Sequence, residues 1–166
     1  MKQYIGTKMI QAAPAIRFLL KSGENMIVEK DDKHAMEYAQ AMIEAGEVTA
    51  WEEAYTVVYK DGYSSWSPAK VFEEAYRETS GMNFGLAIEA AKKGKKIARA
   101  GWNGKSQYVE LATGISYTNN AREIVNAEHA AIGNAALAFV GTSGVQLGWL
   151  ASQADMLADD WYIVEV

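Results

Sequence analysis

The sequence lacks cysteine and contains only two prolines and two histidines among 166 residues. Without cysteine, neither disulfides nor thiolate metal sites can form, and this absence favours a cytoplasmic location. No stretch approaches the roughly 20 apolar residues that a membrane span requires. The first residues also lack the apolar segment of a signal peptide. We therefore expect a cytoplasmic protein with no membrane partner.

Groups suited to catalysis are also scarce. His34 and His129 are the only side chains whose unperturbed pKa lies near neutral pH, and neither has a partner at metal-ligand spacing. The sequence patterns of serine hydrolases, phosphate-binding loops, zinc hydrolases and calcium loops are absent. Asp159 and Asp160 fit either an acid–base pair or solvated charges before a strand. We predict no catalytic residue, no metal and no cofactor.

The charge balance limits the class of ligand. The chain has 16 basic and 21 acidic residues, a formal net charge of −5. Long nucleic acids need many phosphate contacts and usually a basic face, so we expect no such partner. A small anion needs only one or two local cations and some backbone N–H groups, which this chain can supply.

The pattern of elements predicts an α+β fold of two small domains, 1–81 and 82–166. Each is expected to hold a mostly antiparallel sheet packed by one or more helices, because the strand connections are short. The boundary is the short polar joint Thr79-Ser80-Gly81.

In the first domain, residues 4–10 are expected to form a strand. Asp31 and Asp32 are expected to cap a helix that runs through Ala45 and stops at Gly46. Asp61-Gly62 lies between two β-forming runs and predicts a two-residue hairpin turn with positive φ at both positions. Ser67 is the expected N-cap of a second helix. That helix has Pro68 in its first position and the predicted buried face Val71, Phe72 and Ala75.

In the second domain, Asn83 is expected to cap a helix that ends before Gly94. Ser152 and Asp155 have the spacing of a capping box. The stretch 119–133 is ambiguous, with a helix as one interpretation. The expected strands are 95–98, 108–111, 136–140, 145–147 and 161–165.

The stretch 99–105 carries the most suggestive binding pattern. Gly101 and Gly104 around Asn103 allow the backbone to approach a ligand closely. Arg99 and loop N–H groups suit a phosphate, and Trp102 offers a flat face for a purine. The same residues also fit a simple tight turn.

A second cluster precedes the C-terminus. Asp155 and Asp160 suit hydrogen bonds from ribose hydroxyls or a base amino group. Trp161 is predicted to form the wall of a slot opposite Trp102. Tryptophans beside strands are more often core residues, which is the competing interpretation and applies most strongly to Trp149.

Three ordered segments carry a family resemblance. They are Met82-Asn83-Phe84-Gly85-Leu86-Ala87, Lys95-Lys96-Ile97-Ala98-Arg99-Ala100-Gly101-Trp102-Asn103-Gly104 and Gln153-Ala154-Asp155-Met156-Leu157-Ala158-Asp159-Asp160-Trp161. With them, residues 82–166 resemble the second type of Thoeris anti-defence protein, a phage sponge family. The front half, which looks fused on, is loosely similar to small phage proteins of unknown role.

The resemblance implies a non-enzymatic protein of the bacterial host cytoplasm. It implies sequestration of cyclic ADP-ribose-type signals, with cyclic di- or trinucleotides as a further ligand class, by a homotetramer with pockets between subunits. The ligand-binding residues expected on this basis are Trp102, Trp161, Arg99, Gly101, Asn103, Phe84, Asp155 and Met156.

Two other functions fit the residues. One is a phage structural or interaction protein whose tryptophans are all core residues, and the other is an enzyme that degrades a cyclic nucleotide. Recovery of unchanged ligand, recovery of product, or absence of binding distinguishes the three.

Overall fold

The computed structural model describes residues 7–102, 106–126 and 135–165, which form two compact units, 1–76 and 77–166. Both combine helices with antiparallel sheet, so the predicted α+β class is confirmed. None of the helices in the described ranges is long and apolar enough to cross a membrane.

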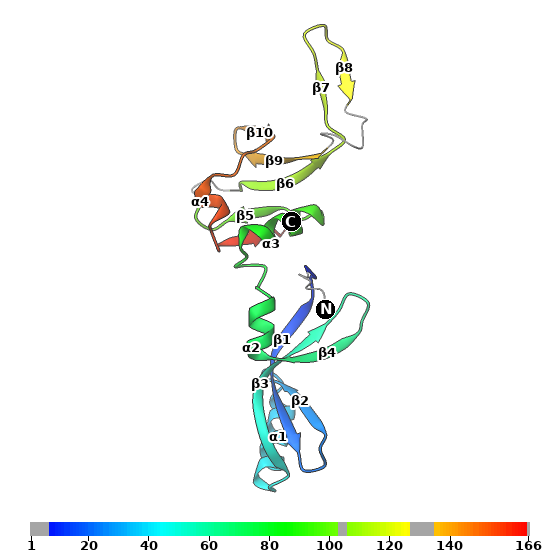
Figure 1. Ribbon diagram of the computed structural model, residues 1–166, viewed down its shortest axis with the longest axis vertical. Coiled ribbons are helices and arrows are strands. Elements are labelled where there is room, and N and C mark those ends of the chain that lie inside the picture. The colour runs from blue at the N-terminus through cyan, green and yellow to red at the C-terminus, as the bar shows by residue number, and fades with distance from the viewer. Residues whose placement is uncertain (1–6, 103–105, 127–134, 166) are drawn as a thin grey trace, which may run out of the picture. The chain divides into compact units, whose positions relative to one another are not determined.

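The first unit is built on a four-stranded antiparallel sheet of order β2-β1-β3-β4 (Figure 1). Its core consists of Phe18, Val28 and Ala39, where α1 packs against the sheet. The elements are β1 (Gln11–Leu20), β2 (Asn25–Glu29), α1 (Lys33–Glu44), β3 (Val48–Val58), β4 (Ser64–Pro68) and α2 (Ala69–Ala75).

The helix predicted after Asp32 is confirmed. The Asp32 carboxylate accepts the Ala35 N–H at 3.0 Å, and Gly46 follows the helix with φ +70°. The strand predicted over residues 4–10 is wrong for residues 7–10, and residues 1–6 lie outside the described ranges. The strand begins at Gln11 because β3, its pairing partner, ends opposite it at Val58.

The hairpin predicted around Asp61-Gly62 is present, but its turn differs. The loop has three residues, 60–62, and of these only Gly62 has a positive φ, +86°. Tyr59 donates its N–H to the Tyr63 carbonyl, and the Asp61 carboxylate accepts the Tyr63 N–H at 3.1 Å. This is a turn closed by a residue in the left-handed region, where glycine carries no steric cost.

The start of α2 was predicted one residue too early. Ser67 and Pro68 pair with Tyr55 and Ala54 in the sheet, and this pairing keeps both residues extended, so the helix begins at Ala69. The predicted buried face of α2 is also wrong, since Val71 is 57% exposed and Ala75 is exposed. Phe72 alone is half-buried, stacked on Tyr55 at 4.1 Å between ring centroids.

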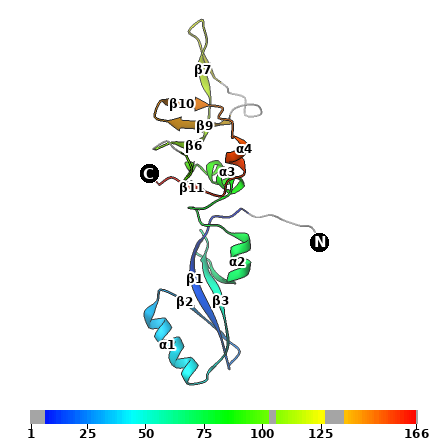
Figure 2. The same cartoon turned by 90° about the vertical axis from the view of Figure 1, so that its left-hand side faces the viewer.

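The second unit holds a five-stranded antiparallel sheet of order β10-β9-β6-β5-β11, with α3 packed against it (Figures 1 and 2). The buried core is Met82, Ala87, Ala90, Ala91, Ile97, Val109 and Trp161. The elements are α3 (Phe84–Lys92), β5 (Ile97–Arg99), β6 (Tyr108–Thr113), β7 (Ser116–Thr118), β8 (Ile124–Asn126), β9 (Ala135–Gly141), β10 (Gly144–Leu147), α4 (Gln153–Met156) and β11 (Trp161–Ile163).

The helix caps predicted from local sequence in the second unit are confirmed. Asn83 caps α3, with its side chain accepting the Leu86 N–H at 2.9 Å, and Gly94 follows with φ +80°. The capping box of α4 is also present. In the ambiguous stretch 119–133, residues 119–126 form the turn of the β7–β8 hairpin and the strand β8, not a helix, and residues 127–134 lie outside the described ranges.

Candidate functional site

Aromatic side chains form one cluster in the second unit. Trp102 lies at its centre, in edge-to-face contact with Phe139, Trp149 and Trp161 at ring-centroid distances of 5.4, 5.9 and 5.4 Å. Phe84, the first residue of α3, contacts Trp161 at 5.5 Å. Such edge-to-face pairs add about 0.5–1.5 kcal/mol each beyond the burial of apolar area. The cluster therefore joins the loop after β5 to the sheet and to α3.

Arg99, the last residue of β5, lies between two carboxylates. Its Nε donates to Asp160 Oδ1 at 2.7 Å, and its Nη1 donates to Asp155 Oδ1 at 2.9 Å and to the Ala154 carbonyl at 3.1 Å. The Arg99 side chain is 17% exposed and the Asp155 side chain 13% exposed. The hydrogen bonds that Arg99 donates to Asp160 and then to Asp155 raise the pKa of Arg99 against the opposing effect of burial.

Asp155, on α4, links the ion pairs to the aromatic cluster. One carboxylate oxygen accepts Trp102 Nε1 at 3.0 Å as well as Arg99, and the other accepts the N–H and hydroxyl of Ser152. The Asp155 carbonyl accepts Trp161 Nε1 at 2.9 Å. Burial acts to raise the pKa of Asp155, but hydrogen bonds from Ser152, Trp102 and Arg99 together lower it from 3.8 to about 2.

Asp160 holds the loop that carries Trp102. Its Oδ2 accepts the Gly101 N–H at 2.8 Å, while its backbone carbonyl accepts the Ala100 N–H at 3.1 Å. The hydrogen bond from Arg99 lowers the pKa of Asp160. Burial acts in the opposite direction but has a smaller effect. A Cβ at Gly101 would lie 2.9 Å from Asp160 Oδ2, so any larger residue there would have to displace this carboxylate.

The predicted slot between Trp102 and Trp161 is not present. Trp161 is 0% exposed, and its ring meets Trp102 at 76°, with the two rings in direct contact. Two walls around a purine would have to be parallel and separated by a base. Trp161 is a core residue because β11 pairs with β5 on one side and bridges Met82 on the other, which places its indole under α3.

Arg99, Gly101 and Asp155 make polar contacts within the protein, and their ligand contacts stay a prediction. Their polar groups bind one another, Asp160 and Trp102, and so support the loop and α4 internally. Trp102 and Phe84 are half-buried. Met156 is 38% exposed. Asn103 lies outside the described residues.

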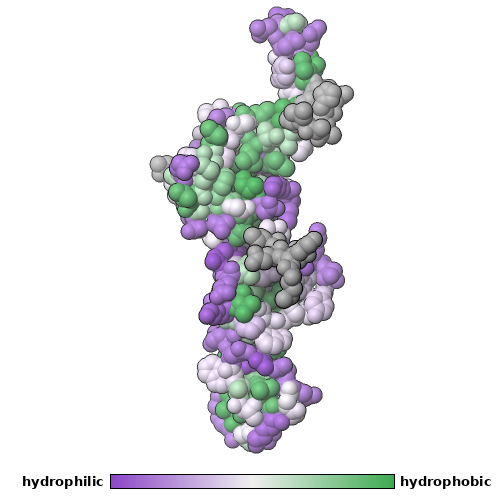
Figure 3. Space-filling view, in the orientation of Figure 1, coloured by the Kyte–Doolittle hydropathy of each residue, from purple (hydrophilic) through white to green (hydrophobic). Residues whose placement is uncertain are grey.

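Sequence reasoning missed the Arg99 ion pairs. Arg99 lies 56 residues from Asp155 and 61 from Asp160, and no local spacing connects them. Sequence reasoning also missed a set of exposed apolar side chains in the second unit. Figure 3 shows apolar residues on the visible surface of this unit. In the stretch 145–157 these are Val145, Leu147, Leu150, Met156 and Leu157, with Leu150 88% and Leu157 79% exposed.

Within the described ranges, no three His, Cys, Asp or Glu side chains are grouped as metal ligands. The polar network instead consists of ion pairs and hydrogen bonds that join α4, β5 and the residue before β11. These features define a small antiparallel α+β domain whose charged groups organise a tryptophan-bearing loop.

Residues 82–164 match the Thoeris anti-defense 2-like domain, and the chain belongs to this family. It is similar to Thoeris anti-defense 2 of Bacillus phage SP01, with 34% identity over 88 residues that cover 50% of this chain and 94% of that protein. The predicted resemblance of residues 82–166 is confirmed. Membership of the family supports a role in phage anti-defence.

The low pKa of Asp155 predicts an acid-sensitive second unit. A carboxylate whose folded-state pKa is depressed contributes stability above its unfolded value, and this contribution is lost as pH falls through the folded value. Stability should therefore decline between pH 4 and about 2, and Asp155→Asn should weaken this dependence. Urea unfolding at a series of pH values measures the stability of the wild type and of the variant. An unchanged pH profile in the variant would contradict the assigned network.

Gly101→Ala should destabilise the second unit by about 1–3 kcal/mol, the usual cost of overpacking a tight site. The new Cβ must displace the Asp160 carboxylate, which Arg99 holds in place. Gly81→Ala is the matched control, because its Cβ would have no atom within 4 Å. Urea unfolding of both variants provides the measurement, and equal midpoints would show that the close approach at Gly101 is unimportant.

Proposed function

We propose that this chain is a phage anti-defence sponge of the bacterial host cytoplasm. It binds and sequesters cyclic ADP-ribose-type immune signals without cleaving them. The observation that carries the proposal is the half-buried Trp102 in a domain of the anti-defence family, on a loop tied through Gly101 to Asp160. A purine stacked on a preorganised ring loses little additional loop entropy on binding.

The state of the carboxylates supports capture without turnover. A general base works best with a pKa near the operating pH, whereas Asp155 and Asp160 have lowered pKa values and bind Arg99. At neutral pH both stay ionised and bonded within the protein. They therefore hold Trp102 in place and do not transfer protons to or from a ligand.

One stacking ring is not enough for a sponge. Stacking contributes about 1–3 kcal/mol per base, whereas nanomolar binding requires about 12 kcal/mol. Because Trp161 is buried, the remaining contacts must come from polar groups and from enclosure by a neighbouring subunit. This requirement favours pockets between subunits, and the family resemblance implies that the assembly is a homotetramer. Met156 and Phe84 remain candidates for such contacts.

Exposed apolar groups support self-association of the second unit. Leu150 and Leu157 are largely exposed, which is costly for a small domain that remains alone in water. The β7–β8 hairpin projects beyond the five-stranded sheet in both views (Figures 1 and 2), with Tyr117 62% and Ile124 72% exposed. A two-stranded hairpin is marginal by itself, so packing against another subunit would stabilise it.

A second candidate function is an interaction protein without a small-molecule ligand. The complete burial of Trp161 favours it, because this tryptophan serves the core. The exposed Leu150 and Leu157 would then form a surface for a protein partner. The two functions differ in whether any cyclic nucleotide binds.

Calorimetry on the full chain should detect tight binding of a cyclic ADP-ribose isomer. The panel should contain those isomers together with cyclic di- and trinucleotides, which test the second ligand class. Heat denaturation followed by chromatography should return the bound compound unchanged. Release of a cleaved product would identify an enzyme, and absence of binding across the panel would favour the interaction protein.

Trp102→Ala should abolish this binding and also destabilise the second unit, because the indole contacts three aromatic rings and donates to Asp155. Trp102→Phe keeps an aromatic face and is expected to retain both the fold and most of the affinity. Circular dichroism and calorimetry on the two variants separate folding from binding. Wild-type affinity in a folded Trp102→Ala protein would show that the stacking assignment is wrong.

A further inference from the structure

The outer edge of β3 in the first unit is only partly paired. β4 pairs with Ala54–Val58 and no further, although β3 extends back to Val48. Among the described residues, no strand pairs with the outer side of Val48–Glu53. A bulge opposite Leu19 and Leu20 interrupts the register near Thr49, so the regular part of this open edge is the segment 50–53.

The direction of the backbone groups along this edge follows from the hairpin. Tyr59 directs its N–H toward β4, where the Tyr63 carbonyl accepts it. Alternate residues of a strand face the same neighbour, so Tyr55, Glu53 and Trp51 also direct their N–H and C=O groups outward. Pro14, which has no N–H, lies opposite Tyr55 and fits this alternation.

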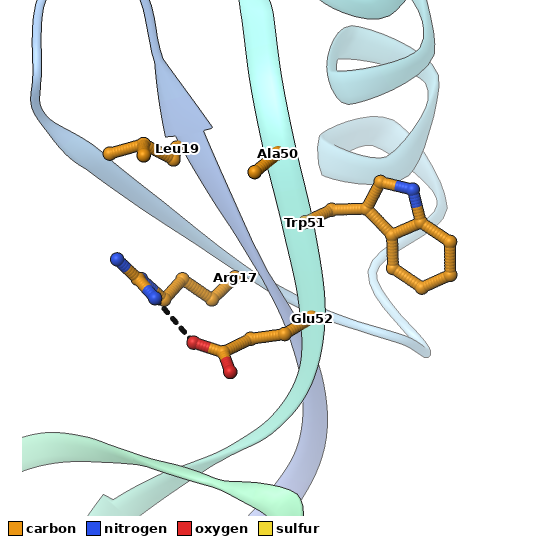
Figure 4. Close-up of a pocket in the computed structure, with 5 residues that line it drawn as sticks. All are labelled: Arg17, Leu19, Ala50, Trp51 and Glu52. Atoms are coloured by element: carbon orange, nitrogen blue, oxygen red, sulfur yellow. Dashed lines mark hydrogen bonds and ion pairs between the residues drawn. The ribbon is translucent and has the colours of Figure 1, made fainter.

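The side chains of the edge lack the usual protection against pairing. Trp51 is 63% exposed, although open edges are normally blunted by charge or proline. Glu52 forms an ion pair with Arg17, and Glu53 forms one with Lys30, so both charges are compensated. A pocket of about 200 Å³ lies on the sheet where β1 pairs with β3, next to this edge (Figure 4). It is lined by Arg17, Leu19, Ala50, Trp51 and Glu52.

We propose that this edge pairs with the same edge of a second copy of the chain. The two segments run antiparallel about a two-fold axis at Trp51, so that each Trp51 lies opposite its counterpart. The proposal concerns the first unit and does not depend on the sponge function.

The register makes the segment complementary to itself. Trp51 has outward N–H and C=O groups, so the central pair exchanges two backbone hydrogen bonds. Ala50 then lies opposite Glu52, and Glu53 opposite Thr49, so no carboxylate faces another carboxylate. The two Trp51 rings lie on the same face of the joined sheet and cover each other. Shifting the axis to Glu53 would place two glutamates directly opposite, which is unfavourable.

The natural absence of cysteine gives a direct test. In the full-length chain, Trp51→Cys places two thiols in a hydrogen-bonded antiparallel pair. The Cα atoms of such a pair are about 5.5 Å apart, within the range of a disulfide. Mild oxidation should convert most of this variant to a species of twice the 18.2 kDa chain mass. Tyr38→Cys is the control, because Tyr38 is similarly exposed, at 60%, but belongs to α1 and not to the edge segment.

A second measurement keeps Trp51 in place and tests the register. Oxidation of a mixture of Ala50→Cys and Glu52→Cys chains should give the mixed disulfide in preference to either homodimer, because these residues are directly opposite. Formation of this product supports the proposal even if Trp51→Cys disturbs the fold. Cross-linking of Trp51→Cys no greater than that of Tyr38→Cys, together with absence of the mixed product, would overturn it.

Discussion

The second unit depends on the placement of Arg99 between Asp155 and Asp160. This arginine comes from β5, Asp155 from α4 and Asp160 from the residue before β11, so one guanidinium joins three segments. The Arg99 and Asp155 side chains are 17% and 13% exposed, and that of Asp160 is 36% exposed. The position of Trp102 follows from this arrangement, because Asp155 binds its indole and Asp160 binds the preceding residue.

The same arrangement changes the expected means of ligand recognition. Residues that looked suited to binding phosphate and ribose instead bind one another. The side chains that remain at least partly exposed are Trp102, Met156 and the apolar side chains around α4. A small domain with so much exposed apolar surface is better suited to completing a site by association than to enclosing a ligand alone. In the first unit, the open edge of β3 is likewise proposed to pair with a second copy of the chain.

Local signals predicted much of the fold because their physics is local. Asp32, Asn83 and Ser152 cap helices through hydrogen bonds to residues three positions away, and they were identified correctly. The hairpin at Gly62 was predicted, but its loop length was not, because that length depends on the register of β3 with β4. Ser67 was misassigned as a cap since sheet pairing overrode its preference.

The sequence alone determined the class of fold, the N-terminal caps of α1, α3 and α4, the absence of thiol chemistry and the family of the second half. These follow from composition, short-range spacing and ordered motif segments. Only the tertiary structure decided that Trp161 is core and that Arg99 holds two carboxylates. It also decided that Val48–Glu53 keeps an open edge. Each of these depends on which segments meet in the fold, and the contacts of Arg99, across 55 or more residues, leave no periodic trace in the chain.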